Sequence, residues 1–135
     1  MSEQSLDIAG VLLITVPTIE FGGVSLLGFI RRRTPGYLDN PVRQDLFRAG
    51  HAHAGVLVIL ALLGLLYVDQ ADLGSGVKDL VRTCLVAAPI LIPAGMFFSV
   101  ASPRATSPNR LIALVYVGAA ALAVGAVTLG VGLLR

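Results

Sequence analysis

The sequence predicts an all-α integral membrane protein whose single domain, residues 1–135, is a bundle of four transmembrane helices. Of its 135 residues, 56% are hydrophobic and only 13% are charged, whereas soluble domains carry about 25% charged residues. Crossing the hydrocarbon core takes about 20 apolar residues of helix, and four stretches of the chain are long enough. We therefore expect a multi-pass protein of a bacterial or archaeal cell membrane.

Composition also excludes several classes of function. The ten Lys and Arg residues fall mostly in short clusters between apolar runs, and the net charge is only +2, so no continuous basic face for nucleic acid is present. Cys84 is the sole cysteine, which excludes an intramolecular disulfide and a CxxC motif. The N-terminus lacks the basic start of a secretory signal. We expect the first helix to be retained.

The first predicted helix covers residues 8–30 and carries Glu20 near its middle. A bare carboxylate at that depth is strongly disfavoured, so Glu20 should be either neutral or paired. It either lines the floor of a pocket beneath a histidine site or hydrogen-bonds a carbonyl group freed near Pro17.

The second predicted helix, residues 49–67, opens with the only two histidines, His51 and His53. Histidine within a membrane usually has a partner or a task, and imidazole is the usual proximal ligand of haem iron. Two residues turn a helix by about 200°, so these side chains cannot bind one metal together. The small residues around them, Gly50, Ala52, Ala54 and Gly55, leave room for a flat macrocycle. The alternative is a pair of interface histidines bonded to headgroups or loop carbonyls.

The third predicted helix covers residues 81–100 and should be kinked by Pro89 and Pro93. It ends with Met96 and Phe97, at a depth similar to that of His53. Such a cluster is either ordinary core or part of a cofactor pocket.

The fourth predicted helix covers residues 111–134 and carries Tyr116 near its start, at a depth similar to that of His53. Its small residues recur at spacings of three and four and form one seam, Gly118, Ala121, Gly125, Thr128 and Gly132. Small residues let membrane helices pack closely. The seam serves either packing within one chain or a subunit interface.

Basic residues border the same edge of the membrane, namely Arg48, Arg104 and Arg110. Their guanidinium groups could bind the two propionates of a haem, although basic residues at a membrane border need no ligand.

Four short motifs occur in order along the chain: Pro35-Gly36-Tyr37, Arg48-Ala49 leading to His53-Ala54-Gly55, Gly95-Met96-Phe97, and Ser107-Pro108-Asn109-Arg110. In these motifs and their spacing the chain resembles the styrene oxide isomerases. These are small four-helix membrane proteins that bind haem b between the protomers of a trimer. The resemblance implies a homotrimer in the membrane lipid that binds haem b.

The resemblance also implies roles for individual residues. His53 would be the axial iron ligand if His53-Ala54-Gly55 is matched to the family motif. Matching Arg48-Ala49 instead would make His51 the ligand. The ferric iron would act as a Lewis acid that opens a small lipophilic epoxide to an aldehyde by a hydride shift. An apolar pocket for this substrate would be lined by Phe97, Met96, Tyr116 and Glu20. We expect Glu20 and Tyr116 as catalytic residues, and His53, His51, Arg48, Met96, Phe97 and Arg110 as haem-binding residues.

Two positions depart from the family pattern. The pocket asparagine of the family is Ile59 in this chain, and the tyrosine of its third helix is Phe97. Both changes remove hydrogen bonds that would hold a substrate.

Other functions remain open at this level. His51-Ala52-His53 also resembles the His-x-His pair of haem-copper oxidases and nitric oxide reductases, in which two imidazoles bind two haems. A non-enzymatic haem protein for gas sensing, electron relay or haem transfer is the main alternative, with Met96 or a neighbour's histidine as second iron ligand. A structural subunit without a cofactor is the third.

Overall fold

The computed structural model describes all 135 residues and consists of four long helices. These are α1 (Glu3–Arg31), α2 (Pro41–Val68), α3 (Ser75–Ser99) and α4 (Ala113–Leu133), and a single 3₁₀ turn, η1 (Arg110–Ile112), leads into α4. Each of the four is long and apolar enough to cross a membrane. The predicted all-α fold with four transmembrane helices is confirmed, and the chain is a multi-pass membrane protein.

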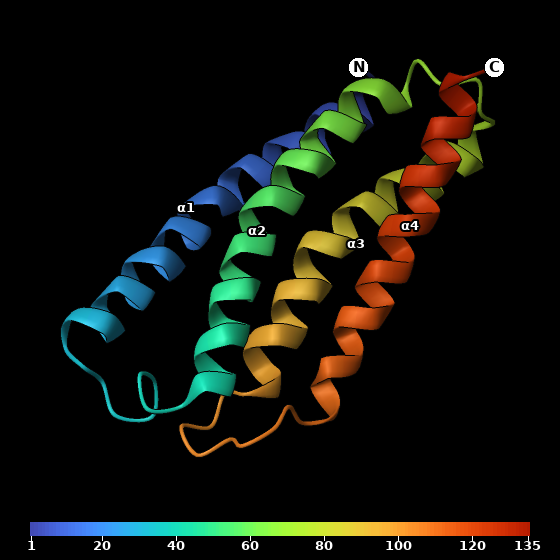
Figure 1. Ribbon diagram of the computed structural model, residues 1–135. Coiled ribbons are helices and arrows are strands. Elements are labelled where there is room, and N and C mark those ends of the chain that lie inside the picture. The colour runs from blue at the N-terminus through green and yellow to red at the C-terminus, as the bar shows by residue number, and fades with distance from the viewer.

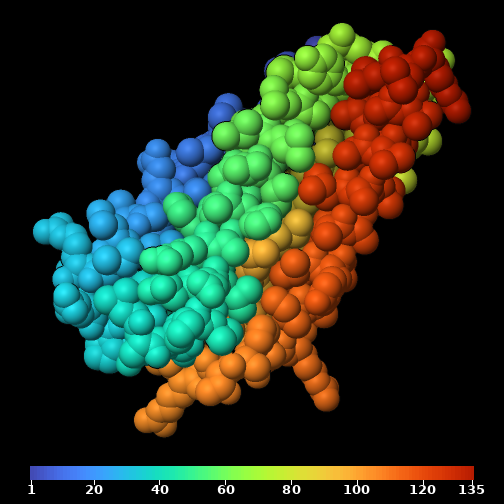
Figure 2. Space-filling model, viewed as in Figure 1, coloured from blue at the N-terminus to red at the C-terminus, as the bar shows by residue number.

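The helices lie side by side, with both termini and the α2–α3 turn at one end of the bundle (Figure 1). The α1–α2 and α3–α4 connections lie at the other end, which we call the histidine end because His51 and His53 lie nearer to it. Helix α3 packs against both α2 and α4, whereas α1 packs chiefly against α2. In the space-filling view, α3 is largely covered, and its middle part is visible as a narrow strip between α2 and α4 (Figure 2). Helix α1 is therefore the most peripheral element.

Helix α2 begins eight residues before the apolar stretch that predicted it. The Asn40 side chain caps the helix by accepting a hydrogen bond from the backbone N–H of Arg43, and Pro41 occupies the first turn, where its missing N–H costs nothing. The predicted helix bounds place residues 31–48 outside any helix, which is wrong for about half of these residues because α2 already begins at Pro41. The two histidines lie about three turns into α2 rather than at its start.

The small-residue seam of α4 packs within the chain. A Cβ atom added to Gly118 would lie 2.7 Å from Cγ1 of Ile92, and one added to Gly125 would lie 2.9 Å from Cβ of Cys84. Both neighbours belong to α3. The seam therefore lets the α3 and α4 backbones approach each other, and the reading of these glycines as a subunit interface is wrong.

The two connections at the histidine end are tied together by side chains of α2 and its cap. The Arg43 guanidinium donates hydrogen bonds to the carbonyl oxygens of Gly36, Val100 and Ala101. The Asn40 amide donates to the carbonyl oxygens of Pro103 and Ala105. These bonds fix the ends of α1, α2 and α3 relative to one another.

The opposite end is held by a buried arginine. Arg82 is only 6% exposed and forms ion pairs with Asp69 at 2.6 Å and Asp79 at 2.7 Å. Its Nε donates to the Ser5 hydroxyl of α1, and the backbone N–H of Ser2 donates to Asp69. The network joins the start of α1 to α3 and to the α2–α3 turn.

Candidate functional site

The imidazole of His53 is exposed on the outside of α2, with one ring nitrogen fixed. Its Nδ1 lies 2.7 Å from the carbonyl oxygen of Ala49, one turn earlier. A carbonyl oxygen can only accept a hydrogen bond, so Nδ1 carries a proton, and in the neutral ring Nε2 then keeps a free lone pair. A metal-bound histidine commonly holds its second nitrogen in this way.

His53 lies at the outer edge of the α2 face that packs on α3 and α4, where its side chain remains exposed. Residues four apart share one helix face, and Leu57, four residues beyond His53, packs with Ile92, Met96 and Val115 of those helices. None of the cavities within the chain is lined by His53. Its free nitrogen therefore faces the membrane or another molecule.

His51 points to a different side of α2, toward α1. A Cβ atom added to Gly23 would lie 3.0 Å from both Cε1 and Nε2 of His51, and one added to Gly22 would lie 3.7 Å from Nδ1. The ring fits beside α1 because these two positions lack side chains. The expectation that the two histidines face different sides of the helix is confirmed.

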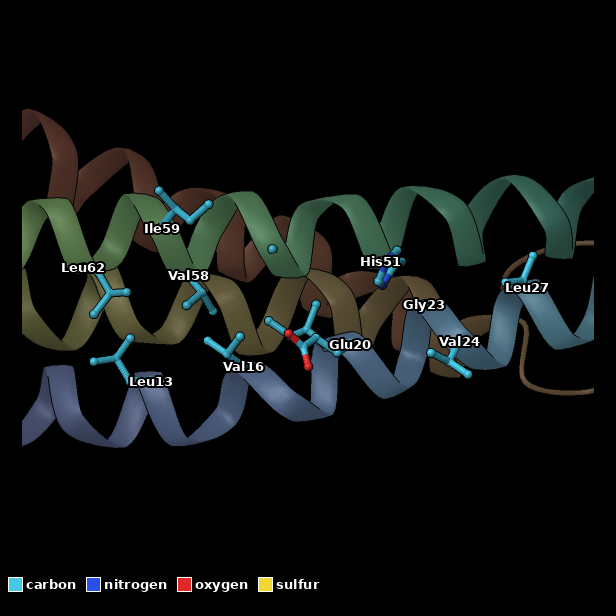
Figure 3. Close-up of a pocket in the computed structure, with 12 residues that line it drawn as sticks. Leu13, Val16, Glu20, Gly23, Val24, Leu27, His51, Val58, Ile59 and Leu62 are labelled. Carbon is cyan, nitrogen blue, oxygen red and sulfur yellow. The ribbon is translucent and has the colours of Figure 1, made fainter.

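Glu20 and His51 line the same cavity between α1 and α2 (Figure 3). The cavity has a volume of about 670 Å³, and its other lining residues are aliphatic or glycine. Ile59 lies at its upper edge in this view. The sequence-based pocket that would join Glu20 to His53 is thus not formed within one chain, because His51 and not His53 faces α1.

A second cavity lies on the other side of His51, between α1, α2 and α3. It has a volume of about 340 Å³, and its wall includes Pro89, Pro93 and Phe97 of α3. Phe97 and Met96 also pack on Gly50, where an added Cβ atom would lie 3.2 Å from both side chains. Phe97 therefore shares a cavity with His51.

The remaining predicted site residues are dispersed. Tyr116 is 72% exposed on the outer face of α4, so the chain itself does not bring it into a pocket. Arg48 and Arg110 are exposed near the histidine end, and neither forms an ion pair, since Arg82 makes both ion pairs of the chain. No group of three or more His, Cys, Asp or Glu side chains could hold a bare metal ion.

The pair Gly22 and Gly23 is a site feature that the sequence analysis missed. Their absent side chains make the space for the His51 ring. Adjacent glycines in the middle of a transmembrane helix are a recognisable sign of close approach, but the sequence does not say which side chain approaches.

No family model matches this chain, and no curated protein or solved structure matches it either.

Proposed function

We propose that this chain is a haem b-binding membrane protein in which His53 is the axial iron ligand. The observation that carries the proposal is the state of the His53 ring, whose Nδ1 is committed to the Ala49 carbonyl and whose Nε2 is free on an exposed face. An imidazole facing lipid without a partner is costly. Coordination of iron by Nε2 would supply the missing partner.

The surroundings of His53 suit a flat macrocycle. Its neighbours on the outer side of α2 include Ala49 and Ala52, whose small side chains allow a planar ligand to lie against the helix. Arg48 and Arg110 have no ionic partner within the chain and border the same end of the bundle. Their guanidinium groups would hold the carboxylates of a haem.

A second copy of the chain would complete this site. His53 lines none of the cavities of the chain, so a haem held by it would not be enclosed by this chain alone. The resemblance to the styrene oxide isomerases supports a homotrimer in which the neighbouring subunit covers the other face. In that assembly the exposed Tyr116 would be available to a site between subunits.

The same resemblance supports an enzymatic role. Held by His53, a ferric haem would supply a Lewis acid for the oxygen of a small lipophilic epoxide, which is the chemistry that isomerisation to an aldehyde without net redox change requires. The chain's own part is to hold the haem and to provide apolar surroundings that exclude water.

The second candidate function is that of a non-enzymatic haem protein for gas sensing, electron relay or haem transfer. The positions that carry hydrogen-bonding residues in the isomerases are Ile59, which lines the cavity between α1 and α2, and Phe97, which packs on Gly50. Neither side chain offers a hydrogen bond to a substrate.

Replacement of each histidine tests the proposed ligand. Protein purified in detergent from cells supplied with haem precursor should show a Soret band in the wild type and in His51→Ala, and His53→Ala should lose it. Circular dichroism and the elution volume of each variant check that the bundle is intact. A folded His53→Ala protein with full haem content would exclude His53 as the ligand.

A panel of aryl epoxides separates the two candidate functions. If the chain is an isomerase, at least one epoxide is converted to its aldehyde by the wild type, and His53→Ala gives no more product than buffer. Absence of turnover across the panel, with haem bound, would remove the isomerase and leave the non-enzymatic haem protein.

A further inference from the structure

The groove between α1 and α2 contains two ionisable side chains that have no partner within the chain. Glu20 and His51 both line this groove, among aliphatic residues and glycines. Both ion pairs of the chain involve Arg82 at the far end, and neither Glu20 nor His51 takes part in a side-chain hydrogen bond. Ionisable groups within a membrane generally have a partner or a function.

Along α1, Glu20 and the contact point of His51 lie about one helical turn apart. His51 packs on Gly23 of α1, and Glu20 lies three residues before Gly23, on the same face of that helix. In the close-up, Glu20 lies between α1 and α2, and His51 points from α2 toward Gly23 (Figure 3). The carboxyl group and the imidazole therefore border the same stretch of the groove.

The groove opens sideways to the membrane. Among its lining side chains, Val24 is 67% exposed and Ile59 is 60% exposed, on opposite walls. Its volume of about 670 Å³ falls within the range of about 300 to 1,000 Å³ that is usual for small-molecule sites. A molecule dissolved in the bilayer can therefore enter it from the side.

We propose that this groove is a binding site for a lipophilic alcohol. The hydroxyl group donates a hydrogen bond to a carboxyl oxygen of Glu20 and accepts one from a ring N–H of His51, and the aliphatic chain packs against the apolar walls. A hydroxyl group can do both whether or not the carboxyl group is ionised, whereas an amine needs the carboxylate and an acyl chain of bulk lipid offers no polar group. The site lies on the α1 side of α2, away from His53, and is independent of haem binding.

Photolabelling in vesicles tests the proposal. The wild-type protein is reconstituted in phosphatidylcholine vesicles and illuminated with diazirine-bearing decanol or, separately, diazirine-bearing decane, and adducts are located by peptide mass spectrometry. We expect decanol adducts to concentrate on the residues of α1 and α2 that line the groove and to be displaced by unlabelled decanol. Decane should label exposed residues of all four helices without such competition.

Matched variants assign the labelling to the two polar groups. Loss of one hydrogen-bonding group should reduce decanol labelling about fivefold, so Glu20→Leu and His51→Phe should both show this decrease. Glu20→Gln keeps an acceptor oxygen and should retain labelling. The control is Thr83→Val, which removes an exposed hydroxyl group of α3 that bonds only its own helix.

Three results would overturn the proposal. Equal, non-competed labelling by decanol and decane would mean that bulk lipid fills the groove. Unchanged decanol labelling in folded Glu20→Leu and His51→Phe proteins would mean that the polar groups do not bind the hydroxyl group. Stronger labelling by diazirine-bearing decylamine than by decanol would make the ligand a cation.

Discussion

At the scale of single residues, the two histidines differ because α2 turns by about 200° between them. His53 faces outward and donates from Nδ1 to its own helix, while His51 packs on the glycine pair of α1. The first arrangement leaves a nitrogen free for a ligand outside the chain, and the second leaves a ring in a groove shared with Glu20. One His-x-His segment therefore presents its two imidazoles to two different surroundings.

Asp69 is the residue whose protonation the fold controls most strongly. Burial opposes its ionisation, but hydrogen bonds from the Ser2 backbone and hydroxyl, from Ser5 and from Arg82 outweigh that effect and hold the pKa of Asp69 well below its ordinary value of 3.8. A carboxyl group with a lowered pKa stabilises the folded state above its unfolded pKa, and this stabilisation is lost as the pH falls through the folded value.

We therefore expect the bundle to lose stability as the pH is lowered below about 4, with Asp69→Asn showing less of this dependence. At neutral pH the variant should be destabilised by about 1 to 3 kcal/mol, because Arg82 keeps its burial and loses its closest ionic partner. Unfolding followed by circular dichroism at several pH values measures both effects. The control is Asp72→Asn, at an exposed position in the same turn. If the free energy of unfolding changed equally with pH in the wild type and in both variants, this role of Asp69 would be contradicted.

At the scale of elements, the stability of the bundle depends on how closely α4 approaches α3. Apolar side chains gain little by leaving lipid for another helix, so membrane helices associate through close packing. At Gly125 an added Cβ atom would lie 2.9 Å from Cβ of Cys84, which cannot move without its backbone. At Gly130, on the same helix, an added Cβ atom would meet nothing within 4 Å.

This difference predicts that the same substitution changes the stability of the bundle at Gly125 but not at Gly130. Gly125→Leu should destabilise the bundle by about 1 to 3 kcal/mol through overpacking, and Gly130→Leu should change its stability little. Thermal unfolding in detergent compares the two variants with the wild type. Equal stability of the two variants would show that the α3–α4 contact does not depend on the glycine seam.

The sequence predicts the positions of the helices well, but it does not predict which helices pack against each other or which side chains they bring together. Hydropathy predicts the four membrane spans because each must be apolar over its length. It misses the first turns of α2, where Asn40 and Pro41 begin the helix outside the apolar stretch. The angle between His51 and His53 follows from helix geometry, but which helix faces each one depends on packing, so Glu20 was expected with His53 and lies with His51.

At the scale of the whole molecule, the outer faces of the bundle are left for other partners. In the most apolar 18-residue stretch of α1, and likewise in that of the span that contains α4, 11% is buried within the chain. The corresponding share for α3 is 44%. These faces contact lipid or further subunits, and His53 is exposed on the outside of the bundle. A homotrimer with haem between its subunits would cover His53 and part of this surface.

The absorption spectrum of the purified wild-type protein tests the central proposal most directly. Protein expressed with ample haem precursor and purified in mild detergent should show a Soret band, with a haem-to-chain ratio near unity. Helical, monodisperse protein that is colourless under these conditions would contradict the proposal that the free nitrogen of His53 binds haem iron.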